Sequence, residues 1–98
     1  MLEDLEYEDF AAQLNTKFTV SDADGVEVEL VEALRREGLK RQSMFSLVFR
    51  GSADHFLPQQ TYALGHSVLG DGELFLVPIS LEADGYRYEA GFNRLIGD

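Results

Sequence analysis

Two histidines and the carboxylates near them are the residues of this chain best suited to acid–base chemistry. His66 is in phase with the apolar residues of an alternating segment, and Asp71 or Glu73 could approach it across the next hairpin. A His–carboxylate pair is a common general base or ligand. The alternative, which we favour, is a histidine hydrogen-bonded within the fold at the end of a strand. His55 follows Asp54 in a loop and fits a surface position.

No other pattern gives a catalytic or cofactor site. The two histidines are 11 positions apart with no third ligand, which does not make a zinc site. Asp22-Ala-Asp24-Gly25 with Glu27 resembles a fragment of a calcium loop without its remaining ligands. The serines have no nucleophile-elbow context, and Gly70-Asp71-Gly72 does not precede a phosphate-binding helix. We therefore predict no catalytic residue, no metal and no cofactor, and expect that the protein is not an enzyme.

Alternating segments and Asp-Gly turns predict the elements that hold these residues. Asp24-Gly25, Asp71-Gly72 and Asp84-Gly85 are each followed by alternating apolar residues, a pattern typical of hairpins. The predicted fold class is mainly β (α+β): a small antiparallel six-stranded meander, as a curved sheet or barrel, with one short N-terminal helix. The predicted strands are Thr16–Val20, 26–33, Phe45–Arg50, Thr61–His66, Glu73–Ser80 and Tyr86–Asn93.

The helix and two irregular strand positions follow from local spacing. Residues 5–14 are predicted to be helical, and Asn15 is a plausible stop. The alternation shifts phase at Leu30-Val31, which predicts a β-bulge. Pro78 cannot donate to a strand ladder, so we expect an edge or a bulge there. The apolar face of the helix would consist of Tyr7, Phe10, Ala11 and Leu14.

Composition and charge restrict the class of protein. The 98 residues, 45% hydrophobic and without cysteine, predict a single domain over 1–98 that contains no disulfide. The acidic N-terminus does not resemble a signal peptide and no apolar run reaches membrane-helix length, so we expect a soluble, cytoplasmic protein. The net charge of −10 disfavours binding to nucleic acid or to a membrane, and favours basic or apolar partners. The basic segment Arg35, Arg36, Lys40 and Arg41 is the local exception. We interpret it as a solvated connector or a patch facing the acidic helix of a neighbouring copy, with nucleic-acid contact as the alternative.

A longer set of residues resembles a known family. The chain is similar to a family of small bacterial proteins classed as a domain of unknown function, although Gln60 stands where the family usually has glycine. The resemblance implies an accessory or structural association, because members are often encoded beside phage-tail-collar-like or tail-fibre-like proteins. It implies no catalytic residue. The matching segments are Phe10–Leu14, Phe18–Val20, Phe45–Gly51, Phe56–Gln59, Thr61-Tyr62, Leu64, His66, Leu69-Gly70 and Leu74–Pro78.

We expect a noncatalytic interaction module of a bacterial assembly, with tail-fibre-like partners, that binds a protein or a second copy of itself. The candidate partner-binding residues are Val48, Phe56 and Leu57. Val48 lies on the predicted strand Phe45–Arg50, which has no proline or row of charged side chains that would prevent another strand from pairing with its edge, and Phe56 and Leu57 lie in the loop that follows.

Two alternatives remain open at this point. The first is a small-ligand-binding β-barrel or an enzyme, with a pocket lined by Tyr62, His66, Tyr86 and Tyr88. The second is an acidic mimic of nucleic acid that uses the carboxylates of the N-terminal third.

Overall fold

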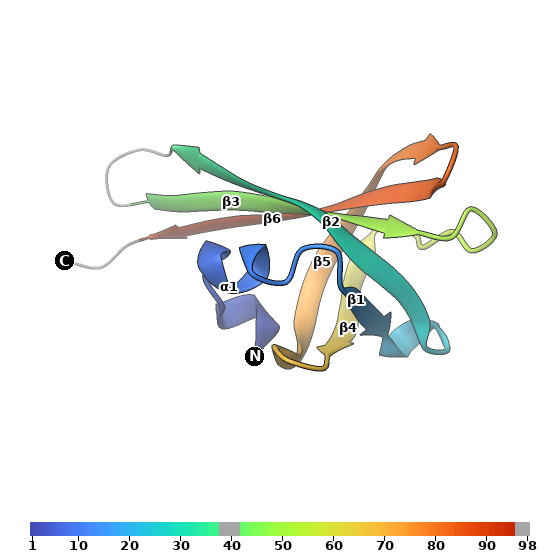
Figure 1. The fold of residues 1–98 in the computed structure, drawn as a ribbon, viewed down its shortest axis with the longest axis horizontal. Helices are drawn as coiled ribbons and strands as arrows, with labels where there is room; N and C mark the ends of the chain where they lie inside the picture. The colour runs from blue at the N-terminus through green and yellow to red at the C-terminus, as the bar shows by residue number, and fades with distance from the viewer. Residues whose placement is uncertain (38–41, 96–98) are drawn as a thin grey trace.

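Six antiparallel strands in one sheet form the body of the protein in the computed structural model, which describes residues 1–37 and 42–95 (Figure 1). The strands are β1 (Lys17–Val20), β2 (Val26–Glu37), β3 (Gln42–Gly51), β4 (Gln60–His66), β5 (Gly70–Glu82) and β6 (Gly85–Leu95). The helical segments are η1 (Leu2–Asp4), α1 (Tyr7–Ala11) and η2 (Ser21–Ala23). The predicted fold class, mainly β with one short N-terminal helix, is confirmed.

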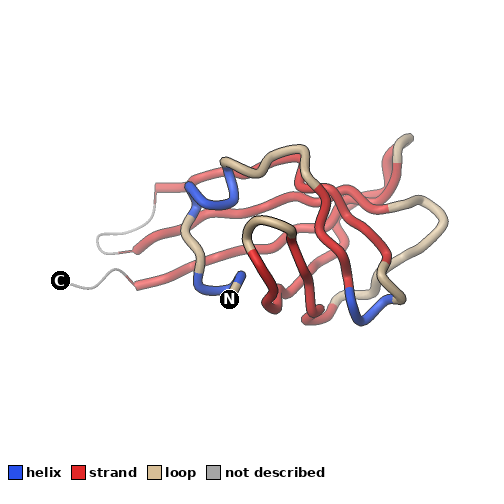
Figure 2. Tube along the Cα trace, turned by 60° about the horizontal axis from the view of Figure 1, so that its bottom comes forward, coloured by secondary structure: helices blue, strands red, loops and turns tan. Residues whose placement is uncertain are grey.

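The strands follow one another around a closed ring in the order β1-β2-β3-β6-β5-β4. Figure 2 shows the strands curving around one another, with loops at both ends of the ring. The order differs from a closed sequential meander in two pairings, because β3 pairs with β6 instead of β4, and β1 pairs with β4 instead of β6. The loop after Gly51 therefore carries the chain across one end of the ring to β4, which pairs with β5 and β1.

Both predicted strand irregularities are present. The β2–β3 register shifts between Leu30 and Glu32, as the phase change in the sequence predicted. The β5–β6 register shifts between Pro78 and Ser80, which leaves Ile79 as the additional residue. Bulges bend a strand and increase its twist, so they help so few strands to form a ring.

The interior is filled by the apolar residues that alternate along each strand. Phe18 and Phe49 meet edge to face with their ring centroids 5.3 Å apart, and both are fully buried. Phe10 on α1 packs against Phe92 at 5.5 Å, which docks the helix on the strands. The helix is shorter than predicted, because it ends at Ala11 and leaves Leu14 outside it and exposed. Asn15 has a φ of 66° and turns the chain toward β1.

Candidate functional site

The loop between β3 and β4 is held by two buried tyrosines. The backbone N–H of Leu57 donates a hydrogen bond to the Tyr88 hydroxyl oxygen, with 2.9 Å between the two atoms. The Tyr62 hydroxyl donates to the carbonyl oxygen of Pro58. Burial raises the pKa of both phenols, so they stay protonated over the physiological range. Leu57 itself is only 2% exposed, and its side chain anchors the loop in the core.

This anchored loop presents Phe56 at the surface. The Phe56 ring is 49% exposed and meets the Tyr86 ring edge to face at 5.1 Å. Tyr86 on β6 lies opposite Leu81 on β5, and Leu81 is 60% exposed. The loop and the β5–β6 hairpin share the right-hand end of the molecule in Figure 1. We call Phe56, Leu81 and Tyr86 the hairpin-end cluster.

Acidic groups lie on the same loop and hairpin as the cluster. Asp54 is exposed and lies two positions before Phe56 in the sequence. Glu82 and Asp84 are exposed at the β5–β6 turn. Asp84 accepts hydrogen bonds from Arg87 at 2.9 Å and from Arg50 at 3.3 Å. The Arg87 guanidinium, with a smaller contribution from Arg50, holds the pKa of the Asp84 carboxyl below its usual value. The carboxylate is therefore charged at neutral pH and is compensated by the two arginines, so the exposed negative charge on this loop and hairpin comes from Asp54 and Glu82.

His66 is bonded within the fold through both ring nitrogens. Its Nδ1 accepts hydrogen bonds from the backbone N–H groups of Val68 and Leu69, each at 3.0 Å. Because Nδ1 is an acceptor, the proton is assigned to Nε2, which donates to the Thr16 hydroxyl oxygen at 2.8 Å. Thr16 in turn donates to the carbonyl oxygen of Gln13. The geometry is that of a strand-end histidine that ties the β4–β5 turn to the start of β1.

The acid–base pair considered for His66 is not formed. Among the described residues, no hydrogen bond joins the His66 ring to Asp71 or Glu73. The ring instead packs against Phe18 with 4.4 Å between centroids. Burial lowers the pKa of His66, because the charged imidazolium would lose solvation. Within the parts of the chain that the structure describes, no group of three or more His, Cys, Asp or Glu has the arrangement of a metal site.

Three of the four residues predicted to line one pocket lie together, and His66 lies apart from them. The Tyr86 and Tyr88 ring centroids are 6.2 Å apart, and Tyr62 and Tyr88 both bond the β3–β4 loop. Tyr62 and Tyr88 lie beneath the β3–β4 loop, where their hydroxyls are used to hold it. Tyr86 belongs to the hairpin-end cluster. His66 is the last residue of β4, and Tyr62 is near the beginning of that strand.

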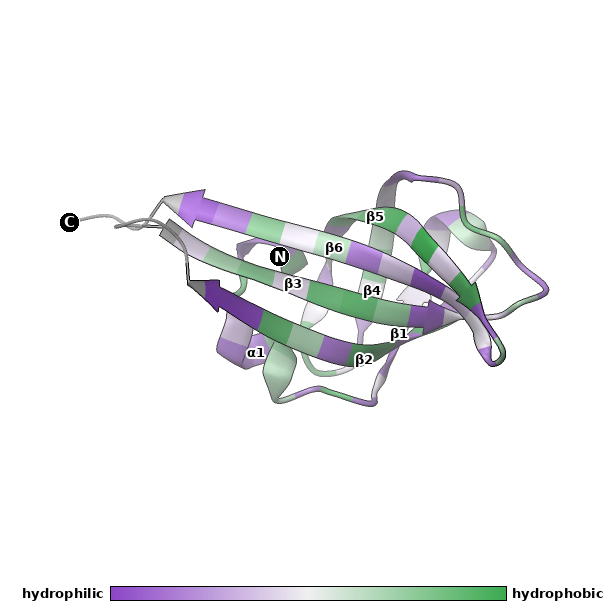
Figure 3. Cartoon of the chain, turned by 90° about the horizontal axis from the view of Figure 1, so that it is seen from above, coloured by the Kyte–Doolittle hydropathy of each residue, from purple (hydrophilic) through white to green (hydrophobic). Residues whose placement is uncertain are grey.

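Of the three residues predicted to bind a partner, the structure corrects Leu57 and removes the free strand edge on which the choice of Val48 rested. Leu57 is part of the core, so it cannot form an exposed contact. Val48 is half-buried on the outer face of β3, and β3 pairs with β2 on one side and β6 on the other. Figure 3 shows β3 between these two strands, so its backbone edge is occupied. Phe56 remains exposed, and its ring packs against the Tyr86 ring.

The basic segment meets the acidic helix of its own chain. Arg35 forms an ion pair with Glu8 on α1, and its guanidinium lies 4.5 Å from the centre of the Tyr7 ring. The expectation of a patch facing the helix of a neighbouring copy is therefore wrong for Arg35. Lys40 and Arg41 lie outside the described residues.

Leu81 is the member of the cluster that the sequence analysis missed. It follows the bulge at Pro78, where the alternation of β5 changes phase. The bulge was predicted, and carrying its phase change through to Leu81 would have placed this leucine on the same side as Tyr86.

Comparison with known families places the chain in one of them. A family model described as a domain of unknown function, DUF6916, matches residues 5–92. The chain belongs to this family. The DUF6916 match extends from just before α1 to Phe92 on β6, so it includes the hairpin-end cluster and the loop that presents Phe56. No curated protein and no solved structure matches the chain. None of the helices in the described residues is both long and apolar enough to cross a membrane.

Proposed function

We propose that this DUF6916 domain is a noncatalytic protein-interaction module that binds its partner through the hairpin-end cluster. The observation that carries the proposal is the half-exposed Phe56 ring on a loop held by Leu57, Tyr62 and Tyr88. Aromatic side chains contribute strongly to interfaces, because they bury a large area and lose little conformational freedom. A loop that is already fixed reduces the entropy lost on binding.

The charge around the cluster defines the chemistry of the partner. Asp54 and Glu82 are exposed on the same loop and hairpin as the cluster, Asp84 is paired with Arg50 and Arg87, and the whole chain carries a net charge of −10. A complementary partner presents an apolar side chain flanked by lysine or arginine. The negative field would speed the encounter, and the apolar contacts would slow dissociation.

We further propose that the module is an accessory component of a bacterial assembly whose partner is a tail-fibre-like protein encoded beside it. The support is the resemblance of residues 10–78 to a family of small bacterial proteins often encoded in that setting. The nucleic-acid mimic is the competing function, and salt separates the two. A complex centred on Phe56 should persist at about 0.5 M salt, where a complex held mainly by charge is strongly screened.

The experiment is co-expression with the products of the neighbouring genes, followed by native mass spectrometry and a binding titration. Phe56→Ser is the test variant. Phe75→Ser is a matched control, because Phe75 is a phenylalanine of nearly the same exposure, 50%, on the outer face of β5. We expect Phe56→Ser to weaken the complex at least about tenfold and Phe75→Ser to leave it unchanged.

Two outcomes would contradict the proposal. One is the absence of any complex with a neighbouring gene product. The other is a complex whose affinity responds equally to the two substitutions, which would place the interface away from the hairpin-end cluster.

A further inference from the structure

A buried serine hydroxyl on the outer face of the sheet has no hydrogen-bond partner. Ser46 lies between Phe45 and Leu47, which both point into the core, so its own side chain faces outward. Ser46 is nevertheless only 5% exposed, and within the described residues its Oγ makes no hydrogen bond. Buried polar groups are normally paired, so an unpaired one calls for an explanation, and a bound ligand would supply one.

The serine forms the floor of a groove across β2, β3 and β6. In the β3–β6 register Ser46 lies opposite Gly91, and a Cβ atom added at Gly91 would meet no atom within 4 Å. The absence of a side chain at Gly91 therefore keeps the space above the floor open. The groove has a volume of about 220 Å³, which suits a molecule smaller than a typical drug. The residues that line it are Arg36, Met44, Phe45, Ser46, Glu89, Gly91, Phe92 and Asn93.

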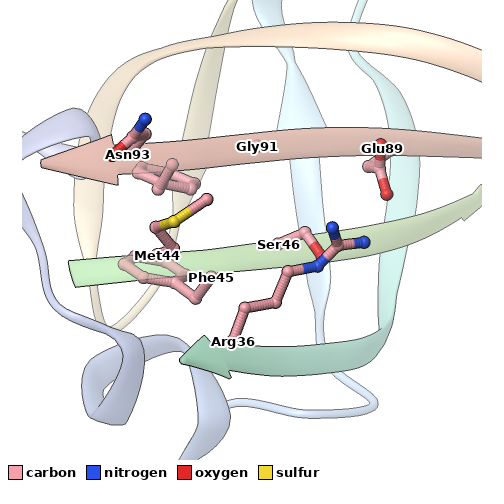
Figure 4. A pocket seen from close by; sticks show the side chains of 8 residues that line it. Arg36, Met44, Phe45, Ser46, Glu89, Gly91 and Asn93 are labelled. Atoms are coloured by element: carbon pink, nitrogen blue, oxygen red, sulfur yellow. The ribbon is translucent and has the colours of Figure 1, made fainter. Parts of the chain in front are cut away.

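Opposite charges flank the hydroxyl. Figure 4 shows the Arg36 side chain extending from β2 toward Ser46, with the Glu89 carboxylate on β6 at the other side of the groove. In the strand registers Arg36 lies opposite Met44 on β3, and Glu89 lies opposite Val48 on β3. Because Met44 and Val48 are separated by four steps along β3, the backbone positions of Arg36 and Glu89 are about 13 Å apart along the strands. Among the described residues, no ion pair joins Arg36 to Glu89.

We propose that this groove binds a small aliphatic α-amino acid. The ligand carboxylate would receive hydrogen bonds from the Arg36 guanidinium and the Ser46 hydroxyl, and the ligand ammonium would lie against the Glu89 carboxylate. The Met44 side chain supplies an apolar wall for the aliphatic group. A cation, a neutral donor and an anion in sequence across the groove match a zwitterion better than a simple anion, which Glu89 would repel. The site is separate from the hairpin-end cluster, so it does not depend on the proposed partner.

The test uses three related probes and the full chain. The probes are L-leucine, N-acetyl-L-leucine, which lacks the ammonium group, and L-leucinamide, which lacks the carboxylate. Each is titrated to about 10 mM while amide resonances are followed by NMR. We expect L-leucine to shift the resonances of Ser46, Glu89 and Gly91. Each incomplete probe should bind at least about tenfold more weakly.

Two variants separate binding from folding. Ser46→Ala should weaken L-leucine at least about tenfold while leaving the melting temperature of the free protein equal or higher, because it removes an unpaired buried hydroxyl. Gly91→Val places a β-favouring side chain in the open groove, so it should abolish binding with an unchanged circular dichroism spectrum. Val68→Ser in the β4–β5 turn, where the Val68 side chain is 68% exposed and does not line the groove, should bind L-leucine normally.

Several results would overturn the proposal. These are no shift of the groove resonances at about 10 mM L-leucine, equal binding of all three probes, or unchanged binding by Ser46→Ala. If Gly91→Val fails to fold, Glu89→Gln replaces it, and an unchanged affinity for L-leucine in that variant would also refute the site.

Discussion

The Tyr88→Phe substitution is a sharp test of how the β3–β4 loop is held. It keeps the buried ring and removes only the hydroxyl that accepts the Leu57 N–H at 2.9 Å. Leu57 is buried, so water cannot replace the lost acceptor. A buried donor without a partner costs about 1–3 kcal/mol. In a domain of this size, a loss of about 2 kcal/mol lowers the melting temperature by about 8–16 °C.

Urea unfolding followed by circular dichroism measures the free energy of unfolding, and calorimetry gives the melting temperature. Tyr86→Phe is the matched control, because within the described residues the Tyr86 hydroxyl has no hydrogen-bond partner. We expect the control to stay within about 0.5 kcal/mol of the parent. If Tyr88→Phe and Tyr86→Phe are equally stable, the hydroxyl does not hold the loop. Phe56 would then not be displayed on a fixed support.

Three further predictions test other parts of the fold. Leu57→Ala should lower the free energy of unfolding by about 2–5 kcal/mol, as expected for a core leucine, whereas Phe56→Ala should lower it by no more than about 1.5 kcal/mol. Similar losses in the two variants would show that Leu57 is not the anchor of the loop and Phe56 is not merely displayed by it. Gly85→Ala should cost about 2–6 kcal/mol, because Gly85 has a φ of 128° and a Cβ atom there would clash with the Gly51 carbonyl oxygen. Gly91→Ala, with open space at its Cβ position, is its control in the same unfolding assay. Because the pKa of His66 is lowered in the folded state, the unfolded chain binds the proton first as pH falls. Stability should therefore decrease from about pH 6.5 down toward the folded pKa, and this slope should be weaker in His66→Asn if urea unfolding is compared at about pH 7.5 and about pH 5.5.

The strands, two of the three Asp-Gly turns and both bulges could be predicted from the sequence because they depend on neighbouring residues. The third prediction was wrong, because Asp71-Gly72 is paired within β5 and the turn lies just before it, at residues 67–69. The alternation of Phe45, Leu47 and Phe49 identifies the inner face of β3 without knowledge of its partners. The phase change at Leu30 and the missing N–H of Pro78 likewise act locally. The two pairings between strands that are not consecutive, β3 with β6 and β1 with β4, were not predictable in the same way. Placing β6 beside β3 depends on the path of the β3–β4 loop, which has no periodic pattern.

The candidate sites were harder to predict, because burial in a loop depends on distant residues. Phe56 and Leu57 are adjacent and both apolar, and no local rule says which of them turns inward. The answer depends on Tyr88, 31 positions away, whose hydroxyl meets the Leu57 N–H. Ser46 has the polarity expected on the outward phase of a strand. Its burial appears only once β2 and β6 lie on either side of it.

The position of β6 between β3 and β5 also has a consequence for how the chain reaches its folded state. Among the six strands described, β6 is synthesised after the others, so β3 and β5 have unpaired edges until β6 is complete. The N-terminal segment also reaches its final contacts only after β6 is made, because Arg94 on β6 donates hydrogen bonds to the carbonyl oxygens of Glu3 and Leu5. Contacts between such distant parts of a chain form slowly, on a scale of about milliseconds to seconds. A nascent chain that stops before Gly85 exposes two strand edges that invite pairing with other chains, so aggregation on the ribosome should depend on whether the final strand is complete.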